Sequence, residues 1–283
     1  MTLLVRDEID IIEDNLSFHF AQGVDHAIVI DNGSVDGTRE FLAGLENQGR
    51  VTVLDEPEQN YQQGIWMTRA ALLARDEFGA DWVINNDADE FWVPGHGDLK
   101  TILAETEADV LSCRRRNMVF AWDSPTGGCW LERCVFSVTS PAEVPRLQNV
   151  LSDPLPCPYF YLDLPDKVLT RTKGLVEITQ GNHSARYNRD FKITGADIEI
   201  LHFPVRSKEQ FSSKTRNGGL AYSRNLALDK RAGWHVRRQF QMIETQGLDA
   251  AIADALPDIA SLEQDLEKGK VFEYLGLKER LSL

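Results

Sequence analysis

The sequence is poor in cysteine, in basic residues and in long apolar runs, and each shortage excludes a class of protein. The four cysteines form no C-x-x-C pair, so we expect reduced, mostly buried thiols and neither a zinc ribbon nor a thioredoxin-like site. Lys and Arg number 30 against 44 Asp and Glu, and the resulting net charge of −14 argues against nucleic-acid binding. A small anionic ligand stays compatible with this charge, because a bound divalent cation can reverse the local field.

No apolar run approaches the roughly 20 residues that are needed to cross a bilayer. The N-terminus also lacks a basic region followed by a long apolar stretch, which is the pattern of a signal peptide. We therefore expect no transmembrane segment and a cytoplasmic, reducing location. Peripheral association with a membrane stays open, and the sequence does not indicate an oligomeric state.

The first half of the 283 residues alternates short apolar strands with amphipathic helices. The predicted strands are residues 2–5, 26–30, 51–54 and 81–85. The predicted helices are residues 9–22, a helix capped by Asp36 that runs to about Glu46, and residues 61–78. This alternation with short connections indicates an α/β fold, in which helices flank a mostly parallel central sheet.

The second half has a different pattern. We predict strands at 110–114, 131–138, 167–170, 176–179 and 197–203, with an irregular proline-rich segment at 141–166. Ser207 and Gln210 form a capping box that opens a helix, and the tail from Gly233 is helical. The predicted organisation is a nucleotide-sugar-binding half (1–106), an acceptor and metal-completing half (107–232) and a C-terminal helical tail (233–283).

Acidic residues follow two of the predicted strands, and parallel α/β sheets bind ligands at the carboxyl ends of their strands. Asp87 and Asp89 lie two residues apart and would repel each other. A hard divalent cation such as Mn²⁺ or Mg²⁺ removes that repulsion, and it could hold a diphosphate and stabilise a leaving group. A solvated acidic turn or a helix cap is the alternative interpretation.

The segment 31–38 (DNGSVDGT) forms a turn after the second strand. The Asp31 carboxylate can accept a hydrogen bond from a base N–H or a ribose hydroxyl, and Gly33 and Gly37 allow close backbone approach. A tight turn with an aspartate cap explains the pattern equally well. The sequence contains neither a G-x-x-x-x-G-K-[ST] loop nor a G-x-G-x-x-G fingerprint.

Three segments in this order resemble the family 2 glycosyltransferases: residues 5–8 (VRDE), 30–38 (IDNGSVDGT) and 82–91 (WVINNDADEF). The resemblance is strongest to a branch that is also similar to the family 92 enzymes. It implies a GT-A fold in which Asp31 contacts the uracil or ribose and the D-x-D pair serves metal and donor. We assign Asp7, Glu8, Asn32 and Asp87 to donor binding on this basis.

The C-terminal half resembles the same branch at residues 131–133 (LER), at 167–169 (KVL) followed by Asn182 and His183, and at 201–207 (LHFPVRS). The resemblance makes His202 and His183 candidate metal ligands beside Asp87 and Asp89, although a lone histidine is more often a core or cap residue. Arg206 and Lys214 could neutralise donor phosphates, or they could lie on a solvated helix face. The sequence lacks the Q-x-x-R-W motif, which disfavours a processive synthase.

The leading hypothesis is a metal-dependent, inverting transfer of a sugar, in the manner of a hexosyltransferase, from a UDP-sugar to a hydroxyl of a glycan or small-molecule acceptor. Such a reaction needs a general base, and Asp123 and Glu132 are the candidates, although Glu132 could instead pair with Arg133. A sugar-phosphate nucleotidyltransferase is disfavoured because residues 1–10 lack a glycine-rich loop with a basic residue. A non-catalytic carbohydrate-binding module on a degenerate fold is the remaining alternative.

Overall fold

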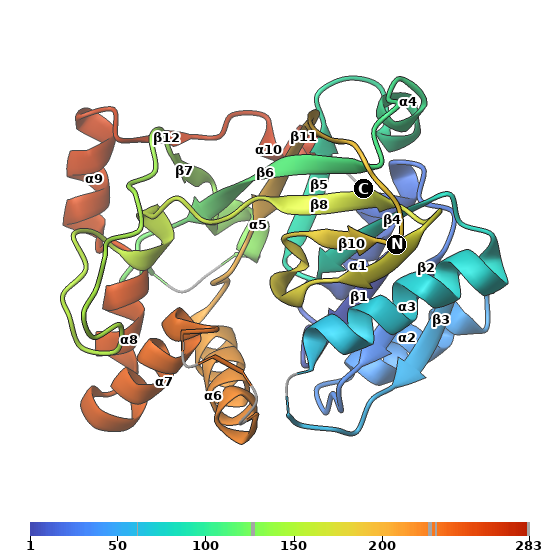
Figure 1. Ribbon diagram of the computed structural model, residues 1–283. Coiled ribbons are helices and arrows are strands. Elements are labelled where there is room, and N and C mark those ends of the chain that lie inside the picture. Colours follow the sequence, from blue (N-terminus) through green and yellow to red (C-terminus); the bar gives the residue numbers. More distant parts are fainter. Residues whose placement is uncertain (61, 126–127, 226–227, 230, 282–283) are drawn as a thin grey trace. The chain divides into compact units, whose positions relative to one another are not determined.

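The computed structural model describes residues 1–60, 62–125, 128–225, 228–229 and 231–281 (Figure 1). Contacts within the chain define two compact units. Unit 1 contains Met1–Arg115, Pro165–Leu201 and Leu281–Leu283, and unit 2 contains Arg116–Leu164 and His202–Arg280. These units follow contacts, whereas the predicted division into a donor half, an acceptor half and a tail is functional and stays a prediction.

The N-terminal part of unit 1 alternates parallel strands with helices. Its sheet has the strand order β3-β2-β1-β4. The elements are β1 (Thr2–Val5), α1 (Ile12–Ala21), β2 (Ala27–Asp31), α2 (Thr38–Glu46), β3 (Val51–Asp55), α3 (Gln63–Phe78) and β4 (Trp82–Asp87). The predicted α/β fold, with helices that flank a central parallel sheet, is confirmed.

Antiparallel strands extend the sheet of unit 1. Strand β8 (Lys167–Arg171) pairs with β4 and with the first residues of β6 (Val110–Val119). Strand β11 (Ile193–His202) pairs with β5 (Glu90–Pro94) and with β6. The unit also contains α4 (Leu99–Ala104), η2 (Gln180–Asn182) and the hairpin of β9 (Leu175–Ile178) and β10 (Ala185–Tyr187).

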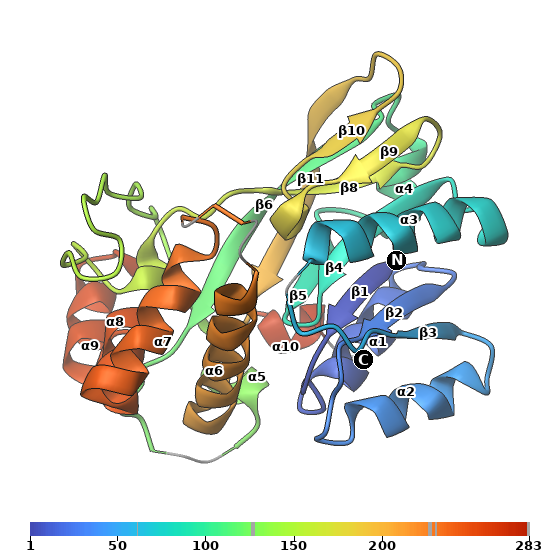
Figure 2. The same cartoon turned by 60° about the horizontal axis from the view of Figure 1, so that its bottom comes forward.

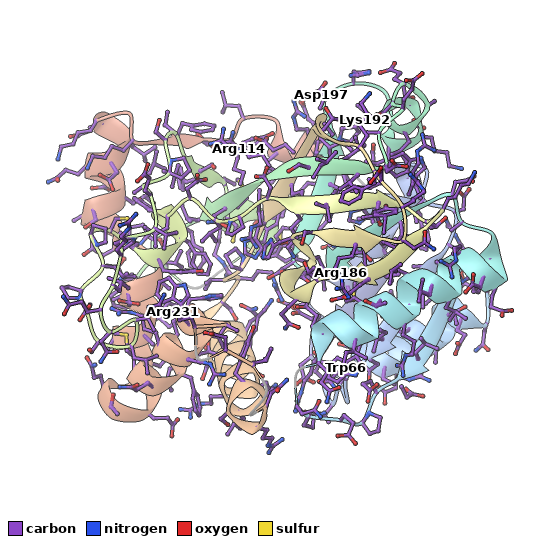
Figure 3. The ribbon with its side chains drawn as sticks, viewed as in Figure 1. Trp66, Arg114, Arg186, Lys192, Asp197 and Arg231 are labelled. Carbon is purple, nitrogen blue, oxygen red and sulfur yellow. The ribbon has the colours of Figure 1, made fainter. Side chains whose placement is uncertain are left out.

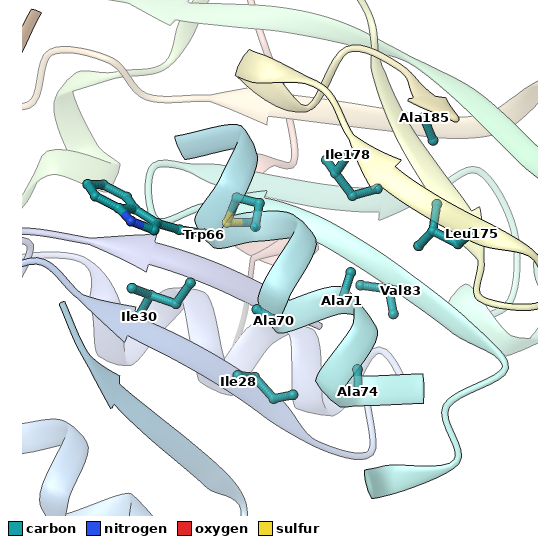
Figure 4. Packing of buried hydrophobic residues seen from close by; sticks show 11 residues of the cluster. Ile28, Ile30, Trp66, Ala70, Ala71, Ala74, Val83, Leu175, Ile178 and Ala185 are labelled. Atoms are coloured by element: carbon teal, nitrogen blue, oxygen red, sulfur yellow. The ribbon is translucent and has the colours of Figure 1, made fainter. Parts of the chain in front are cut away.

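A hydrophobic cluster fixes α3 between the parallel strands and the β9–β10 hairpin (Figures 2 and 4). The face of α3 that enters the cluster carries Ala70, Ala71 and Ala74, whose small side chains let the helix backbone approach its neighbours closely. Trp66 and Met67 complete this face toward the N-terminal end of the helix. The packing thereby holds the first residue of α3 beside the end of β4.

Unit 2 is mainly helical. Its elements are α5 (Trp130–Arg133), β7 (Phe136–Val138), η1 (Tyr159–Tyr161), α6 (Lys208–Arg224), α7 (Trp234–Gln246), α8 (Leu248–Ala255), α9 (Ile259–Glu267), β12 (Val271–Glu273) and α10 (Leu277–Arg280). The predicted helical tail is confirmed, and strand β12 within it pairs antiparallel with β7. The Ser207 side chain caps α6 by accepting a hydrogen bond from the Gln210 N–H, as the capping box predicts.

The prediction of one strand over 131–138 is wrong in its first half, where the chain forms α5. Trp130 packs edge-on against Phe203 with ring centroids 4.7 Å apart, and Arg133 donates to the Arg206 carbonyl oxygen at 2.6 Å. These tertiary contacts hold a single helical turn that the local alternation of residues does not indicate. Among the described residues, no helix combines the length and the apolar character needed to cross a membrane.

Candidate functional site

The carboxyl ends of β1, β2 and β4 bring the predicted donor segments to one edge of unit 1. Val5, at the end of β1, lies opposite Asp31 at the end of β2. Leu4 lies opposite Asp87 at the end of β4. The turns that follow these strands therefore emerge side by side, as the strand order of a parallel sheet requires.

Asp31 is buried, and its two carboxylate oxygens have different surroundings. Oδ2 accepts hydrogen bonds from the N–H groups of Gly33 and Ser34, both at 3.1 Å. Oδ1 is buried and has no hydrogen-bond partner among the described residues. A buried acceptor that is left unsatisfied costs about 1–3 kcal/mol, and more when it is charged. Asp31 Oδ1 is thus prepared to accept a hydrogen bond from a ligand.

Three other residues of the predicted donor set, Asp7, Asn32 and Glu8, make hydrogen bonds that hold the backbone near this edge. Asp7 adopts a left-handed conformation with φ of 55°, and its Oδ1 accepts from the Val35 N–H at 2.8 Å. The Asn32 amide donates to the carbonyl oxygens of Glu56 at 2.9 Å and Glu58 at 2.7 Å. The buried Glu8 opens α1, because its carbonyl oxygen accepts from the first turn of the helix. Direct donor contacts by these three residues stay predictions.

Arg6 is the first residue after β1 and contributes a donor to the same edge. Its Nη1 donates to Gln59 Oε1. Its Nε is buried and finds no hydrogen-bond partner in the described part of the chain. It lies 3.9 Å from Asp7 Oδ2, which is beyond hydrogen-bond distance. The edge therefore holds one unsatisfied N–H on Arg6 and one unsatisfied carboxylate oxygen on Asp31.

The acidic segment 87–90 surrounds a buried ammonium group. Lys167, the first residue of β8, donates from Nζ to Asp87 Oδ2. The same Nζ lies 2.7 Å from Glu90 Oε2, an ion-pair contact without hydrogen-bond geometry. Arg115 Nη1 lies 3.5 Å from Oε1, the other carboxylate oxygen of Glu90. Burial alone would lower the pKa of Lys167, but Asp87 and Glu90 outweigh burial and raise it, so this lysine stays charged.

Two amide side chains hold the other oxygen of Asp87. Gln63 Nε2 and Asn182 Nδ2 donate to Asp87 Oδ1 at 3.3 and 3.4 Å. Gln63 is the first residue of α3, and its own Oε1 accepts from the Gly181 N–H at 3.0 Å. Asn182 is buried with a left-handed φ of 60°, and no described residue donates a hydrogen bond to its Oδ1. Among the described residues, each hydrogen bond to the Asp87 carboxylate comes from an N–H group, and an N–H group does not bind a metal ion.

The space between Asp87 and Glu90 does not fit a divalent cation as the side chains are arranged. Mn²⁺ and Mg²⁺ need open oxygen ligands, and the two oxygens that face this space already contact Lys167 Nζ. A divalent ion 4 Å from the ammonium would meet a repulsion of about 8 kcal/mol at an effective dielectric constant of ~20. The described parts of the chain hold no group of three or more His, Cys, Asp or Glu that could bind a metal. Asp89, which is buried, stays a predicted ligand.

The two candidate histidines lie in different units. In unit 1, His183 Nδ1 donates to the Asp166 carbonyl oxygen at 2.7 Å, and burial lowers the pKa of His183, which favours the neutral form that metals bind. In unit 2, His202 Nδ1 lies 2.8 Å from Asn117 Oδ1, and its ring is buried. Neither contact tests a role in metal binding, so both assignments stay predictions.

The remaining candidates all belong to unit 2. Asp123 Oδ1 accepts from the Ile259 N–H at 2.8 Å, and Glu132 on α5 pairs with Lys278 at 3.2 Å. Arg206 is buried and donates to the Phe203 carbonyl oxygen at 3.2 Å. Lys214 lies on the exposed side of α6. Their roles as base or phosphate ligands stay predictions.

Residues 6–120 match the model of the glycosyl transferase family 2. The match begins at Arg6 and contains Asp31 and the acidic segment 87–90, so the predicted resemblance to family 2 is confirmed for this part of the chain. The resemblance to family 92 stays a prediction. No curated protein matches the chain.

Several solved structures are similar to the chain at low identity. TarS residues 1–349 from S. aureus is 11% identical and has a TM-score of 0.38, with 95% of this chain and 90% of that chain covered. The structure of the same protein in complex with UDP-GlcNAc is 11% identical and has a TM-score of 0.37, with 86% of this chain and 72% of that chain covered. HddC from Yersinia pseudotuberculosis is 11% identical and has a TM-score of 0.37, with 75% of this chain and 96% of that chain covered.

Sequence reasoning missed the residues that surround Asp87. It placed Lys167 in a family-like segment without a role, and it gave no role to Gln63, Asn182 or Arg115. One signal was present: Lys167 opens the buried strand β8, where the other three residues of the segment 167–170 are uncharged. A lysine at such a position needs a buried partner of opposite charge.

Proposed function

We propose that the protein is a glycosyltransferase that takes a sugar from a nucleoside-diphosphate sugar and transfers it to a hydroxyl of a glycan or small acceptor. The observation that carries this proposal is the family match over residues 6–120, whose strand ends form an edge with unsatisfied polar atoms. A UDP-linked hexose is the favoured donor. Inversion of the anomeric centre belongs to the same proposal.

The two unsatisfied groups at the edge suit a uracil base. Uracil has a ring N–H between two carbonyl oxygens, so Asp31 Oδ1 can accept from the N–H while Arg6 Nε donates to a carbonyl. Cytosine and adenine have a ring nitrogen acceptor in place of that N–H, which would face the Asp31 carboxylate. Because a site built for a hydrogen bond strongly rejects analogues that lack it, we expect uracil to be selected over cytosine and adenine.

The transfer itself is a single displacement. The acceptor oxygen forms a bond to the anomeric carbon, the bond from that carbon to the diphosphate breaks, and a general base removes the acceptor proton. Asp123 and Glu132 are the proposed bases, and Arg206 and Lys214 are proposed to bind the phosphates. Mn²⁺ or Mg²⁺, proposed at Asp89 with His183 and His202 as further candidates, would stabilise charge on the leaving diphosphate.

A thermal-shift panel of UDP, GDP, CDP, ADP and UDP-sugars, each with and without Mn²⁺, tests the donor, since a ligand that binds the folded state raises the apparent stability. We expect the largest shifts with the UDP compounds. Asp31→Asn should weaken UDP binding by about 10- to 100-fold, because a hydrogen bond to a charged group contributes about 1.5–3 kcal/mol. Asp55→Asn is the matched control, since Asp55 pairs in register with Asp31 at the exposed end of β3.

Release of UDP from a UDP-sugar, measured with a broad acceptor panel, tests the reaction. The proposal fails if no nucleoside diphosphate is released from any nucleotide sugar and no nucleotide raises the melting temperature. Release of pyrophosphate from a nucleoside triphosphate would instead support nucleotidyl transfer. Sugar binding that ignores both nucleotide and Mn²⁺ would support the carbohydrate-binding module.

A further inference from the structure

Lys167 is an unusual residue in unit 1, because its charged group is enclosed within the protein. Its side chain is 1% exposed, and Glu90, which it contacts, is 0% exposed. A buried ammonium is very costly unless opposite charges surround it. Here one oxygen from Asp87 and one from Glu90 contact the same nitrogen, as two carboxylate ligands would contact a small cation.

Of the three charged groups in contact, Asp87 is the one that reaches solvent. The Asp87 side chain is 31% exposed, whereas Lys167 and Glu90 are enclosed. An ion from solution would therefore reach the space between the two carboxylates past Asp87. The three contacts on Asp87 come from Lys167, Gln63 and Asn182, and each donates an N–H to the carboxylate.

We propose that the Lys167 ammonium is a built-in cation that takes the place of a divalent metal between Asp87 and Glu90. Asp87 is then a fixed hydrogen-bonding carboxylate and not a metal ligand. Removal of the ammonium leaves two carboxylates that face one space, which creates a divalent-cation site there. The inference concerns the charge balance at this edge of the sheet and goes beyond the proposed function. It rests on that function only in the experiments that use UDP.

Lys167→Ala tests the inference by counting bound metal in the absence of nucleotide. We expect the variant to melt at a lower temperature than the wild type, because Asp87 loses its ion-pair partner and Glu90 keeps only Arg115. Calorimetric or electron-paramagnetic-resonance titration should then show that the variant binds one more Mn²⁺ than the wild type does. The affinity for this Mn²⁺ should be at least about tenfold higher than any affinity of the wild type for Mn²⁺ between Asp87 and Glu90. Mn²⁺ should also restore part of the lost melting temperature.

Lys192→Ala is the matched control, since Lys192 is an exposed lysine of the same unit (Figure 3). It should bind Mn²⁺ as the wild type does and should show no metal-dependent recovery. Equal stoichiometry and affinity of Mn²⁺ for Lys167→Ala and the wild type would overturn the inference.

Should Lys167→Ala fail to fold, Asp87→Asn decides the question in a protein that keeps Lys167. The asparagine oxygen can still accept from the ammonium, so the cluster stays assembled. We expect the Mn²⁺ affinity, measured with and without UDP, to change by less than about threefold; a loss of tenfold or more would identify Asp87 as a metal ligand and overturn the inference. Mn²⁺ titrations without nucleotide test the inference and UDP titrations test the function, so the two failures are distinguishable.

Discussion

His19 is a buried histidine with both ring nitrogens engaged. Nδ1 donates to the Asn15 carbonyl oxygen at 2.7 Å, and Nε2 accepts from the Trp92 N–H at 3.3 Å. A proton on Nε2 would face the Trp92 N–H. Burial lowers the pKa of His19 to about 4, so the ring is neutral in the folded protein. The residue links α1 to β5 and is unsuited to acid–base work near neutral pH.

We predict that His19 weakens the protein in mild acid. The unfolded side chain titrates near 6.5 and the folded one near 4, so the unfolded state binds more protons between these values and stability falls as the pH falls. From pH 7 to pH 5 the loss is about 2 kcal/mol. Urea unfolding at both pH values should show a smaller acid loss for His19→Gln than for the wild type.

His96→Gln is the control for this prediction. Asp197 and Glu105 raise the pKa of the exposed His96, so its protonation stabilises the fold as the pH falls. Its removal should therefore leave the acid loss unchanged or make it larger. An identical pH dependence for His19→Gln and the wild type would refute the role of His19.

The acidic residues of the site could be predicted from the sequence, and their partners could not. Asp31 and Asp87 end short apolar strands, and alternation with helices is enough to place such ends on one edge. Lys167 and Asn182 follow Asp87 by 80 and 95 residues. Their approach depends on the antiparallel pairing of β8 with β4 and on the turn after β9, which no local pattern specifies.

At the scale of elements, α3 connects the core to the site. Met67 is fully buried in the cluster around this helix, whereas Ile65 on the same helix is 64% exposed. We predict that Met67→Ala lowers the free energy of unfolding by about 2–5 kcal/mol. Ile65→Ala should change it by no more than about 0.5 kcal/mol. Denaturant unfolding of both variants measures the difference, and equal losses would contradict the packing described for α3.

Helices and strands could be predicted from the sequence where buried apolar residues recur at a regular spacing. The strands and helices of the first 87 residues lie close to their predicted positions, because each has one apolar face or an apolar run between turn residues. Strand β5 and helix α4 are missing from the prediction, and α5 was predicted as strand. These elements are short, so contacts with distant residues such as that of Trp130 with Phe203 determine them more than local preference does.

At the scale of the whole molecule, the family match and the compact units have different bounds. The match ends at residue 120, whereas unit 1 also needs Pro165–Leu201. The later segment supplies β8, which covers an edge of β4, and it supplies Leu175 and Ile178 to the cluster around α3. The family match therefore omits a segment that belongs to compact unit 1.

We predict that residues 1–120 alone do not form a stable domain. They would expose the unpaired edge of β4, leave the cluster incomplete and leave Asp87 and Glu90 without Lys167. Circular dichroism should show no cooperative melting for this fragment, and size-exclusion chromatography should show association. The full chain is the reference. Cooperative melting of the fragment within a few degrees of the full chain would contradict this account.

The distance along the chain from Asp87 to Lys167 also sets an order of events on the ribosome. The ammonium that balances Asp87 and Glu90 is made 80 residues after Asp87. At about 5–20 residues per second, translation takes about 4–16 s to cover that interval. Until Lys167 is made, Asp87 lacks its ion-pair partner and Glu90 has only Arg115. A chaperone that shields this stretch would act before β8 leaves the exit tunnel.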